Sequence, residues 1–283
     1  VLKSLSSGER GIVGIDGEDY PMPSYEEIVK RMKENKEVLS TKIEQGFTKL
    51  LIVPFGVQIN YLKMIYSNAL LLHHARGKLF RTKKDPNEAD VKLDLDKDNP
   101  FYTWDDLDRE KLAYYPKKFD RNDHGGKTKE QLLAEEQTGW HILLIEDMPN
   151  IPRKKEDIKT VGGRVQIDNT ASSMRSYIHI GEEFPSADEY LRGLQESPIY
   201  LHEQGFTPED QIMYVLSYLE ETSQVLDTAS EGRPETLLLG AYSKSHGMVP
   251  TFYWSLLNNR TRIEKIFQQG RNWDFGIRTS VKI

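Results

Sequence analysis

The residues that could do phosphate or metal chemistry stand at spacings that do not complete a motif. Residues 125–128 (Gly-Gly-Lys-Thr) have the form of the end of a phosphate-binding loop, but Arg121 occupies the position of the loop's first glycine. We therefore expect a turn that leads into a capped helix. His73 and His74 are adjacent, so they point to different sides of one helix and cannot chelate one metal from the same face.

Acidic residues cluster between positions 94 and 110. Asp94, Asp96 and Asp98 alternate as calcium ligands do, but a calcium loop also requires a glycine and a final glutamate at set positions, and these are missing. A solvated acidic surface is therefore expected. With no cysteine and no Gly-x-Ser-x-Gly motif in the chain, we predict no catalytic residue, no metal and no cofactor.

Binding chemistry concentrates in residues 240–283. Tyrosine, phenylalanine and tryptophan side chains alternate there with Ser, Asn, Arg and His. Rigid amphipathic rings beside adaptable hydrogen-bonding groups are typical of binding surfaces. The last segment, 275–283, alternates apolar and polar residues, which predicts a half-buried strand that ties the C-terminus into a sheet.

Helix and strand signals place these residues in a mixed fold. Ser24 with Glu27, Thr128 with Gln131, and Ser186 with Glu189 have capping-box spacing, and Thr207 precedes Pro208. Helices are expected at 24–45, 58–74, 128–137, from 186, and at 207–226. Strands are expected at 49–53, 101–104, 112–115, 140–145, 237–242, 252–255 and 276–283, the last three separated by long polar loops.

Composition excludes several classes of function. The chain of 283 residues has 38 basic and 44 acidic side chains, and a net charge of -6 argues against nonspecific nucleic-acid binding. The longest apolar runs, 50–55 and 142–145, are far shorter than a membrane span. Residues 1–10 show no signal peptide. A soluble protein of the cytoplasm, the cell surface or a virion is expected.

The C-terminal residues carry a family resemblance. Tyr253, Trp254 and Ser255 are followed by the segment 276–282, Gly-Ile-Arg-Thr-Ser-Val-Lys. This resembles the Tyr-Trp-Ser … Gly-hydrophobic-Arg-x-x-Val-basic ending of the bacterial and phage branch of the C-type lectin fold. The two helices expected between 186 and 226 match the order of that fold. The branch includes formylglycine-generating enzymes, which depend on cysteine or copper-bound thiolates, and the variable proteins of diversity-generating retroelements. Because this chain has no cysteine, the resemblance points to the variable proteins.

The resemblance implies an α+β fold with two helices packed on small, mostly antiparallel sheets. It places a C-type lectin-like ligand-binding domain at 140–283. Residues 1–139, a helix-strand-helix region with a charged insertion, are either separate or part of the same domain. Variable positions of the family descend from asparagine codons and would lie at about 240–275. The candidate ligand-binding residues are Tyr242, Ser243, Thr251, Phe252, Ser255, Leu256, Asn258, Asn259, Ile266, Phe267, Asn272 and Asp274.

The expected function is therefore non-enzymatic binding of an unknown protein or surface ligand, with the oligomeric state left open. Calcium-dependent sugar binding is not expected, because the Glu-Pro-Asn loop and Trp-Asn-Asp strand of ordinary lectins are absent. Two alternatives remain. One is an enzyme, either on a formylglycine-generating-enzyme-like scaffold or acting on carbohydrate through carboxylates between Asp94 and Glu110. The other is a receptor-binding component of a phage particle.

Overall fold

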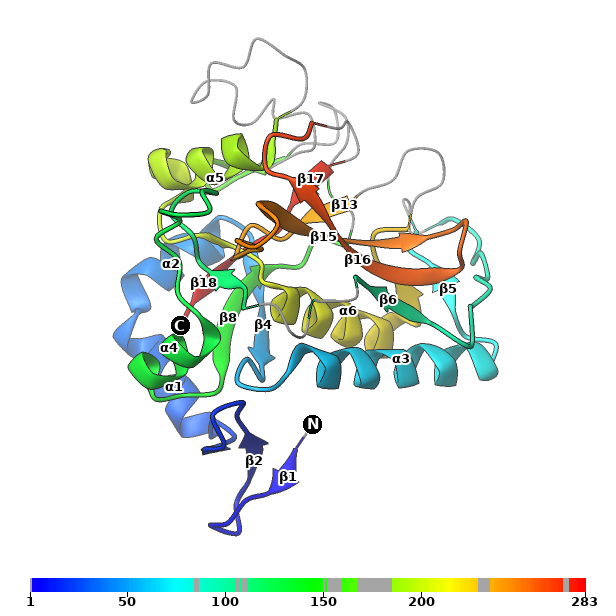
Figure 1. The fold of residues 1–283 in the computed structure, drawn as a ribbon, viewed down its shortest axis with the longest axis horizontal. Helices are drawn as coiled ribbons and strands as arrows, with labels where there is room; N and C mark the ends of the chain where they lie inside the picture. The colour runs from blue at the N-terminus through cyan, green and yellow to red at the C-terminus, as the bar shows by residue number, and fades with distance from the viewer. Residues whose placement is uncertain are drawn as a thin grey trace.

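The computed structural model has an α+β fold with several small sheets (Figure 1). It describes residues 2–83, 87–104, 107, 111–149, 151, 159–166, 185–228, 235–271 and 275–283. The α-helices within these residues are α1 (Tyr25–Glu34), α2 (Lys36–Glu44), α3 (Ile59–Ala75), α4 (Lys129–Glu136), α5 (Ala187–Glu196) and α6 (Pro208–Thr222), with a 3-10 turn at Pro198–Tyr200. No helix in the described ranges combines the length and apolar character needed to cross a membrane.

A four-stranded sheet joins segments that are far apart in the sequence. Its order is β11 (Gln204–Gly205), β18 (Thr279–Lys282), β8 (His141–Glu146) and β4 (Phe47–Val53), and all neighbours are antiparallel. The two most apolar runs of the sequence form β4 and β8. Proline or glycine residues flank each run and limit its length. Pairing of the two strands buries their apolar side chains.

A five-stranded sheet contains most of the predicted binding segment. Its order is β17 (Phe275–Ile277), β13 (Glu235–Leu237), β15 (Met248–Ser255), β16 (Arg260–Phe267) and β6 (Phe101–Thr103). β15 and β16 form a regular hairpin of eight residue pairs, from Met248 opposite Phe267 to Ser255 opposite Arg260. One face of this sheet packs on α3 and α6, which lie side by side (Figure 1).

Short strand pairs complete the fold. They are β1 (Lys3–Ser4), β2 (Arg10–Val13) and β3 (Asp19–Pro21) in one sheet, then β5 (Phe80–Arg81) with β12 (Gln224–Val225), β7 (Ala113–Tyr114) with β14 (Ala241–Tyr242), and β9 (Thr160–Val161) with β10 (Arg164–Val165). Strands β4, β5, β6 and β7 thus pair with strands that follow residue 139. Strand pairing therefore crosses the predicted boundary between residues 1–139 and 140–283.

The predicted helix at 24–45 is interrupted at Asn35. The Ser24 hydroxyl accepts from the Glu27 amide at 3.1 Å, as expected for an N-cap. The Asn35 side chain donates to the Arg31 carbonyl at 3.0 Å, and its backbone leaves the helical region at φ −102° and ψ 19°. An asparagine that bonds to nearby backbone competes with continuation of the helix, so α1 ends there and α2 begins.

The predicted C-terminal strand at 276–283 divides between the two larger sheets. β17 belongs to the five-stranded sheet, β18 belongs to the four-stranded sheet, and Arg278 stands between them. Every residue from Phe275 to Val281 is buried, so the strand is not half-buried as predicted. Of its polar residues, Arg278 bonds to the buried carboxylate of Asp227 and Thr279 to that of Glu203.

The sequence did not predict β16. Residues 260–267 (Arg-Thr-Arg-Ile-Glu-Lys-Ile-Phe) were expected to be part of a polar loop because half of them are charged. Thr261 and Ile263 are buried while Arg260 and Arg262 are only half-buried, which is the two-residue period of a strand. That alternation was the available signal.

Candidate functional site

The structure divides the predicted binding residues into buried and accessible groups. Five are buried: Tyr242, Ser243, Thr251, Phe252 and Ser255. Leu256 and Phe267 are exposed, with 38% and 61% of their surface accessible, whereas Asn258, Asn259 and Ile266 are half-buried. Asn272 and Asp274 lie outside the described residues. The five buried residues cannot contact a ligand on the surface of this structure.

The burial of β15 follows from its central position in the sheet. It pairs with β13 on one side and β16 on the other, and every residue from Val249 to Ser255 is buried. Phe252 meets Phe101 edge to face, with 6.1 Å between ring centroids. These aromatic residues belong to the core, where ring packing and burial stabilise the fold.

Three of the accessible candidates, Leu256, Asn258 and Asn259, lie in the turn between β15 and β16. Ile266 and Phe267 lie at the other end of the hairpin, opposite Val249 and Met248. We call residues 255–260 the hairpin turn. The Asn258 amide donates to the Ser255 hydroxyl at 3.2 Å, and Arg262 donates to the Asn258 side-chain oxygen at 2.8 Å. The Asn259 carbonyl accepts from the Asp96 amide at 2.8 Å. These bonds fix the backbone of the turn from both sides.

Two adjacent leucines project from this fixed turn. Leu257 has 80% of its surface accessible, the largest fraction among the exposed large hydrophobic side chains of the described residues. Leu256 precedes it, and Asn259 closes the turn in the left-handed region at φ 51°. Asparagine tolerates that region better than residues with larger side chains.

Arginine and tyrosine side chains flank the turn. The Arg260 and Arg262 guanidinium carbons lie 5.1 Å and 4.9 Å from the Tyr102 ring centroid, and Arg262 lies 5.9 Å from that of Tyr253. Asp96 pairs with Arg260 at 3.1 Å. Burial, followed by the nearby Glu264 carboxylate, raises the pKa of Tyr253, so its phenol stays protonated. Arginine and tyrosine are among the residue types enriched at protein interfaces.

The residues that carried the family resemblance form the support of the site. Arg278 is buried and pairs with Asp227 at 2.5 Å, and Asp227 also accepts from Thr236 at 2.8 Å and Gln211 at 3.2 Å. At Gly276, a Cβ atom would lie 2.6 Å from a side-chain carbon of Ile151. The ion pair with Asp227 accounts for the arginine of the pattern, and the close approach of Ile151 accounts for its glycine.

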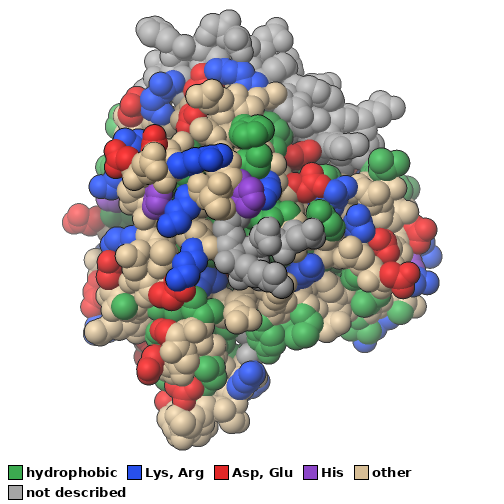
Figure 2. All heavy atoms as spheres, in the orientation of Figure 1, with side chains coloured by type: hydrophobic (Ala, Val, Ile, Leu, Met, Phe, Trp, Pro, Cys, Tyr) green, Lys and Arg blue, Asp and Glu red, His purple; other side chains and the backbone are tan. Residues whose placement is uncertain are grey.

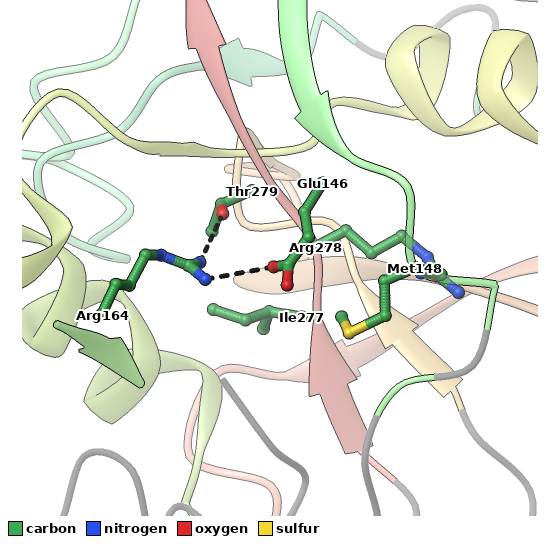
Figure 3. A pocket seen from close by; sticks show the side chains of 6 residues that line it. All are labelled: Glu146, Met148, Arg164, Ile277, Arg278 and Thr279. Atoms are coloured by element: carbon green, nitrogen blue, oxygen red, sulfur yellow. Dashed lines mark hydrogen bonds and ion pairs between the residues drawn. The ribbon is translucent and has the colours of Figure 1, made fainter. Parts of the chain in front are cut away.

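A second buried ion cluster lies beside Arg278. Arg164 donates to both carboxylate oxygens of Glu203, at 2.7 and 2.9 Å, and Lys42 donates to the same group at 2.8 Å. Figure 3 shows Arg164 reaching toward Glu146 and Thr279, while the Arg278 side chain extends toward Met148. The cavity between them has a volume of about 10 Å³, which is the size of one water molecule. It is a polar gap in the core and is too small for a ligand.

The other motifs considered from the sequence have structural roles. Gly125 has φ +66° and leads to Thr128, which caps α4 through a complete capping box, as predicted. Asp94 lies 3.5 Å from His74, and Asp96 pairs with Arg260. Residues 105, 106 and 108–110 lie outside the described residues. Among the residues that are described, no group of three or more His, Asp or Glu side chains could hold a metal ion.

A buried polar cluster at the start of α6 was not predicted from the sequence. Glu209 and Asp210 have no accessible surface, and neither has His141, which stacks on Phe55 at 3.9 Å. Lys129 pairs with Glu209 at 2.6 Å and borders a cavity of about 170 Å³. In the sequence, Glu209 and Asp210 were simply the acidic first turn of a helix.

The surface of the molecule carries mixed charge. Figure 2 shows basic and acidic side chains interspersed over the described part of the face in view. Compared with models of known families, with curated proteins and with solved structures, the chain gave no match.

Core and turn residues of the hairpin should respond differently to substitution. Phe252→Ala is expected to lower the free energy of unfolding by about 3–5 kcal/mol, because it leaves a cavity in the core. Leu257→Ser is expected to change it by less than about 0.5 kcal/mol, because the side chain is exposed. Urea denaturation monitored by circular dichroism measures both. Equal losses in the two variants would contradict the division between core and displayed residues.

Proposed function

We propose that this protein is a non-enzymatic ligand-binding protein on a C-type lectin-like scaffold, and that the hairpin turn presents its binding surface to a protein or surface ligand. The observation that carries the proposal is the exposure of Leu256 and Leu257 on a backbone fixed by hydrogen bonds. The resemblance of residues 253–255 and 276–282 to the variable proteins supports the choice of scaffold.

Physical reasoning favours this turn as a binding element. A single exposed leucine is ordinary, but two adjacent ones on a rigid turn offer apolar area whose burial by a partner is favourable. Because the turn is already ordered, binding would lose little conformational entropy. The half-buried Arg260 and Arg262 beside Tyr102 would supply polar contacts around the leucines.

The burial pattern narrows the set of positions that would diversify. Tyr242, Ser243, Thr251, Phe252 and Ser255 would be constant, because changing a buried side chain destabilises the sheet. The remaining described candidates are Leu256, Asn258, Asn259, Ile266 and Phe267. Among them, Asn259 is restricted further by its left-handed backbone, which would strain most other residues by about 1–3 kcal/mol.

Sequencing this gene in closely related isolates tests the proposal. We expect amino-acid substitutions to concentrate at positions 256, 258, 266 and 267, with position 259 limited to Asn, Asp or Gly. Leu201, which is 59% exposed and lies outside the C-terminal segment, is the matched control for solvent-exposed drift. Substitutions at Leu201 as frequent as those at the hairpin positions would contradict diversification of this surface.

A binding assay tests whether the hairpin positions can bind a protein, independently of whether they vary among isolates. A library randomised at positions 256, 258, 266 and 267 is expected to yield binders to hen egg-white lysozyme, used as a fixed protein probe. A control library of equal size is randomised at exposed residues elsewhere (Met22, Ile43, Met64 and Leu201). If the two libraries yield binders equally often, the hairpin has no special role in recognition.

A further inference from the structure

A cavity separate from the hairpin turn lies where four segments of the chain meet. Its volume is about 170 Å³, far larger than one water molecule requires. The residues that line it come from the N-terminal sheet region, the start of α3, the segment around β7 and the start of α4. Among them are Ile15, Ile59, Leu107, Leu112, Tyr114 and Lys129.

Lys129, whose ammonium group is buried, is one of the residues that line the cavity. Lys129 has 7% of its surface accessible, and its Nζ donates to Glu209 Oε1 at 2.6 Å and to the Val57 carbonyl at 2.8 Å. An ammonium has three N–H groups. Within the described part of the chain, the other groups near Nζ are the Phe55 and Tyr114 rings, whose centroids lie 5.0 and 5.7 Å away. An aromatic face attracts an ammonium but is a weaker partner than an oxygen. The third N–H therefore lacks an oxygen acceptor. A molecule in the cavity could supply that acceptor.

The charges around the ammonium determine what kind of group fits. Glu209 is fully buried and accepts from Lys129 and, at 2.8 Å, from the Tyr114 hydroxyl. Burial, together with the Glu209 carboxylate, raises the pKa of Tyr114, so the phenol keeps its proton. Lys129 and Glu209 carry opposite charges, so the pair has no net charge. An anion beside Lys129 would be repelled by Glu209, and a cation would be repelled by Lys129.

The walls of the cavity favour an apolar body. Ile59, Leu107 and Leu112 are buried, and Ile15 is half-buried. Lys111 and Glu130 are exposed at the mouth and carry opposite charges, so the entrance selects neither sign. Most small-molecule sites combine such apolar walls with a few placed polar groups.

We propose that this cavity is a second binding site, for a small uncharged molecule with an apolar body and a carbonyl-type oxygen that accepts a hydrogen bond from Lys129 Nζ. The site does not depend on the function of the hairpin turn, because its wall residues come from other segments.

Three probes of similar shape test the proposal. Benzamide has a neutral carbonyl acceptor, benzoate carries a charge, and ethylbenzene has no acceptor. We expect the purified protein to bind benzamide at least about tenfold more tightly than either of the others, since a hydrogen bond from a charged donor contributes about 1.5–3 kcal/mol. Isothermal titration calorimetry measures the affinities, and protein-observed NMR locates the binding. Absence of benzamide binding, or tighter binding of benzoate, would overturn the proposal.

Variants assign the binding to this cavity. The double variant Lys129→Met/Glu209→Gln removes the donor without leaving Glu209 as an unpaired charge, and should weaken benzamide binding at least about tenfold. Ile15→Trp fills the cavity from a half-buried wall and should abolish binding of benzamide even if the double variant does not fold. Lys30→Met, on the exposed side of α1 and outside the cavity lining, is the matched control and should retain the affinity. Unchanged affinity in Ile15→Trp would place the binding elsewhere and refute the site.

Discussion

Replacing Glu203 with glutamine is expected to lower the free energy of unfolding by about 3–5 kcal/mol, because two buried cations lose their shared counter-charge. Lys42 has 3% of its surface accessible and Arg164 has 1%, and both bond to the Glu203 carboxylate. Glutamine has nearly the same shape, so the loss measures charge and hydrogen bonding more than packing. Chemical denaturation at pH 7 measures the difference.

The same carboxylate makes stability depend on pH. Burial alone would raise the pKa of Glu203, but the bidentate bond from Arg164 and the charge of Lys42 hold it below its ordinary value. A carboxyl whose pKa is lowered by folding stabilises the folded state above its unfolded-state pKa. That contribution is lost as the pH falls through the folded-state value. We therefore expect the stability difference between the wild type and Glu203→Gln to shrink as the pH falls below about 4.3, the ordinary pKa of glutamate.

Glu27→Gln is the matched control for Glu203→Gln. Glu27 pairs with Arg31 at 2.5 Å on the exposed side of α1, where ion pairs contribute about 0–1 kcal/mol. The control should therefore change stability little at any pH. If both variants lose the same small amount, the buried charges of Lys42, Arg164 and Glu203 do not stabilise the fold as expected.

Replacing Asp227 with asparagine is expected to cost a comparable amount, about 3–5 kcal/mol. Asp227 is the carboxylate partner of Arg278, which has 4% of its surface accessible. Its backbone is left-handed, with φ 54°, and asparagine tolerates that conformation, so the substitution tests the charge and not the backbone. Thermal and urea denaturation should both report the loss.

A double-mutant cycle isolates the pair. Arg278→Met alone leaves Asp227 buried without its cation, whereas Asp227→Asn/Arg278→Met removes both charges. We expect the double variant to lose less than the sum of the two single losses, because neither charge is left uncompensated. Strict additivity would show that the two side chains do not stabilise one another.

Local signals in the sequence predicted most of the helices. Thr128, Ser186 and Thr207 each cap a helix through a complete capping box, and α3 lies within a residue of the predicted 58–74. The break at Asn35 and the strand at Arg260–Phe267 were missed. Around Asn35 the neighbouring residues favour a continuous helix, but the bond from the Asn35 side chain to the Arg31 carbonyl ends it. The charged residues of 260–267 favour a loop, but pairing with β15 makes them a strand.

The candidate site was predictable only in part. The sequence indicated that aromatic and polar residues concentrate after position 240, and the hairpin turn lies among them. It could not distinguish the core residue Phe252 from the exposed residue Leu256. Both are apolar, and the composition of the segment does not indicate which apolar side chains point into the core. The cavity beside Lys129 was not predictable at all, since Ile15, Ile59, Leu112 and Lys129 come from separate segments.

The sequence by itself determined the mixed α+β class, the helix starts and the apolar strands, because caps and hydrophobic periods act over a few residues. The tertiary structure alone decided which polar residues are buried in ion clusters and which stand at the surface. Arg278 and Leu257 show the difference: the arginine is enclosed beside Asp227, and the leucine is exposed on a turn. Burial depends on contacts between distant segments, and the charge of a side chain does not specify those contacts.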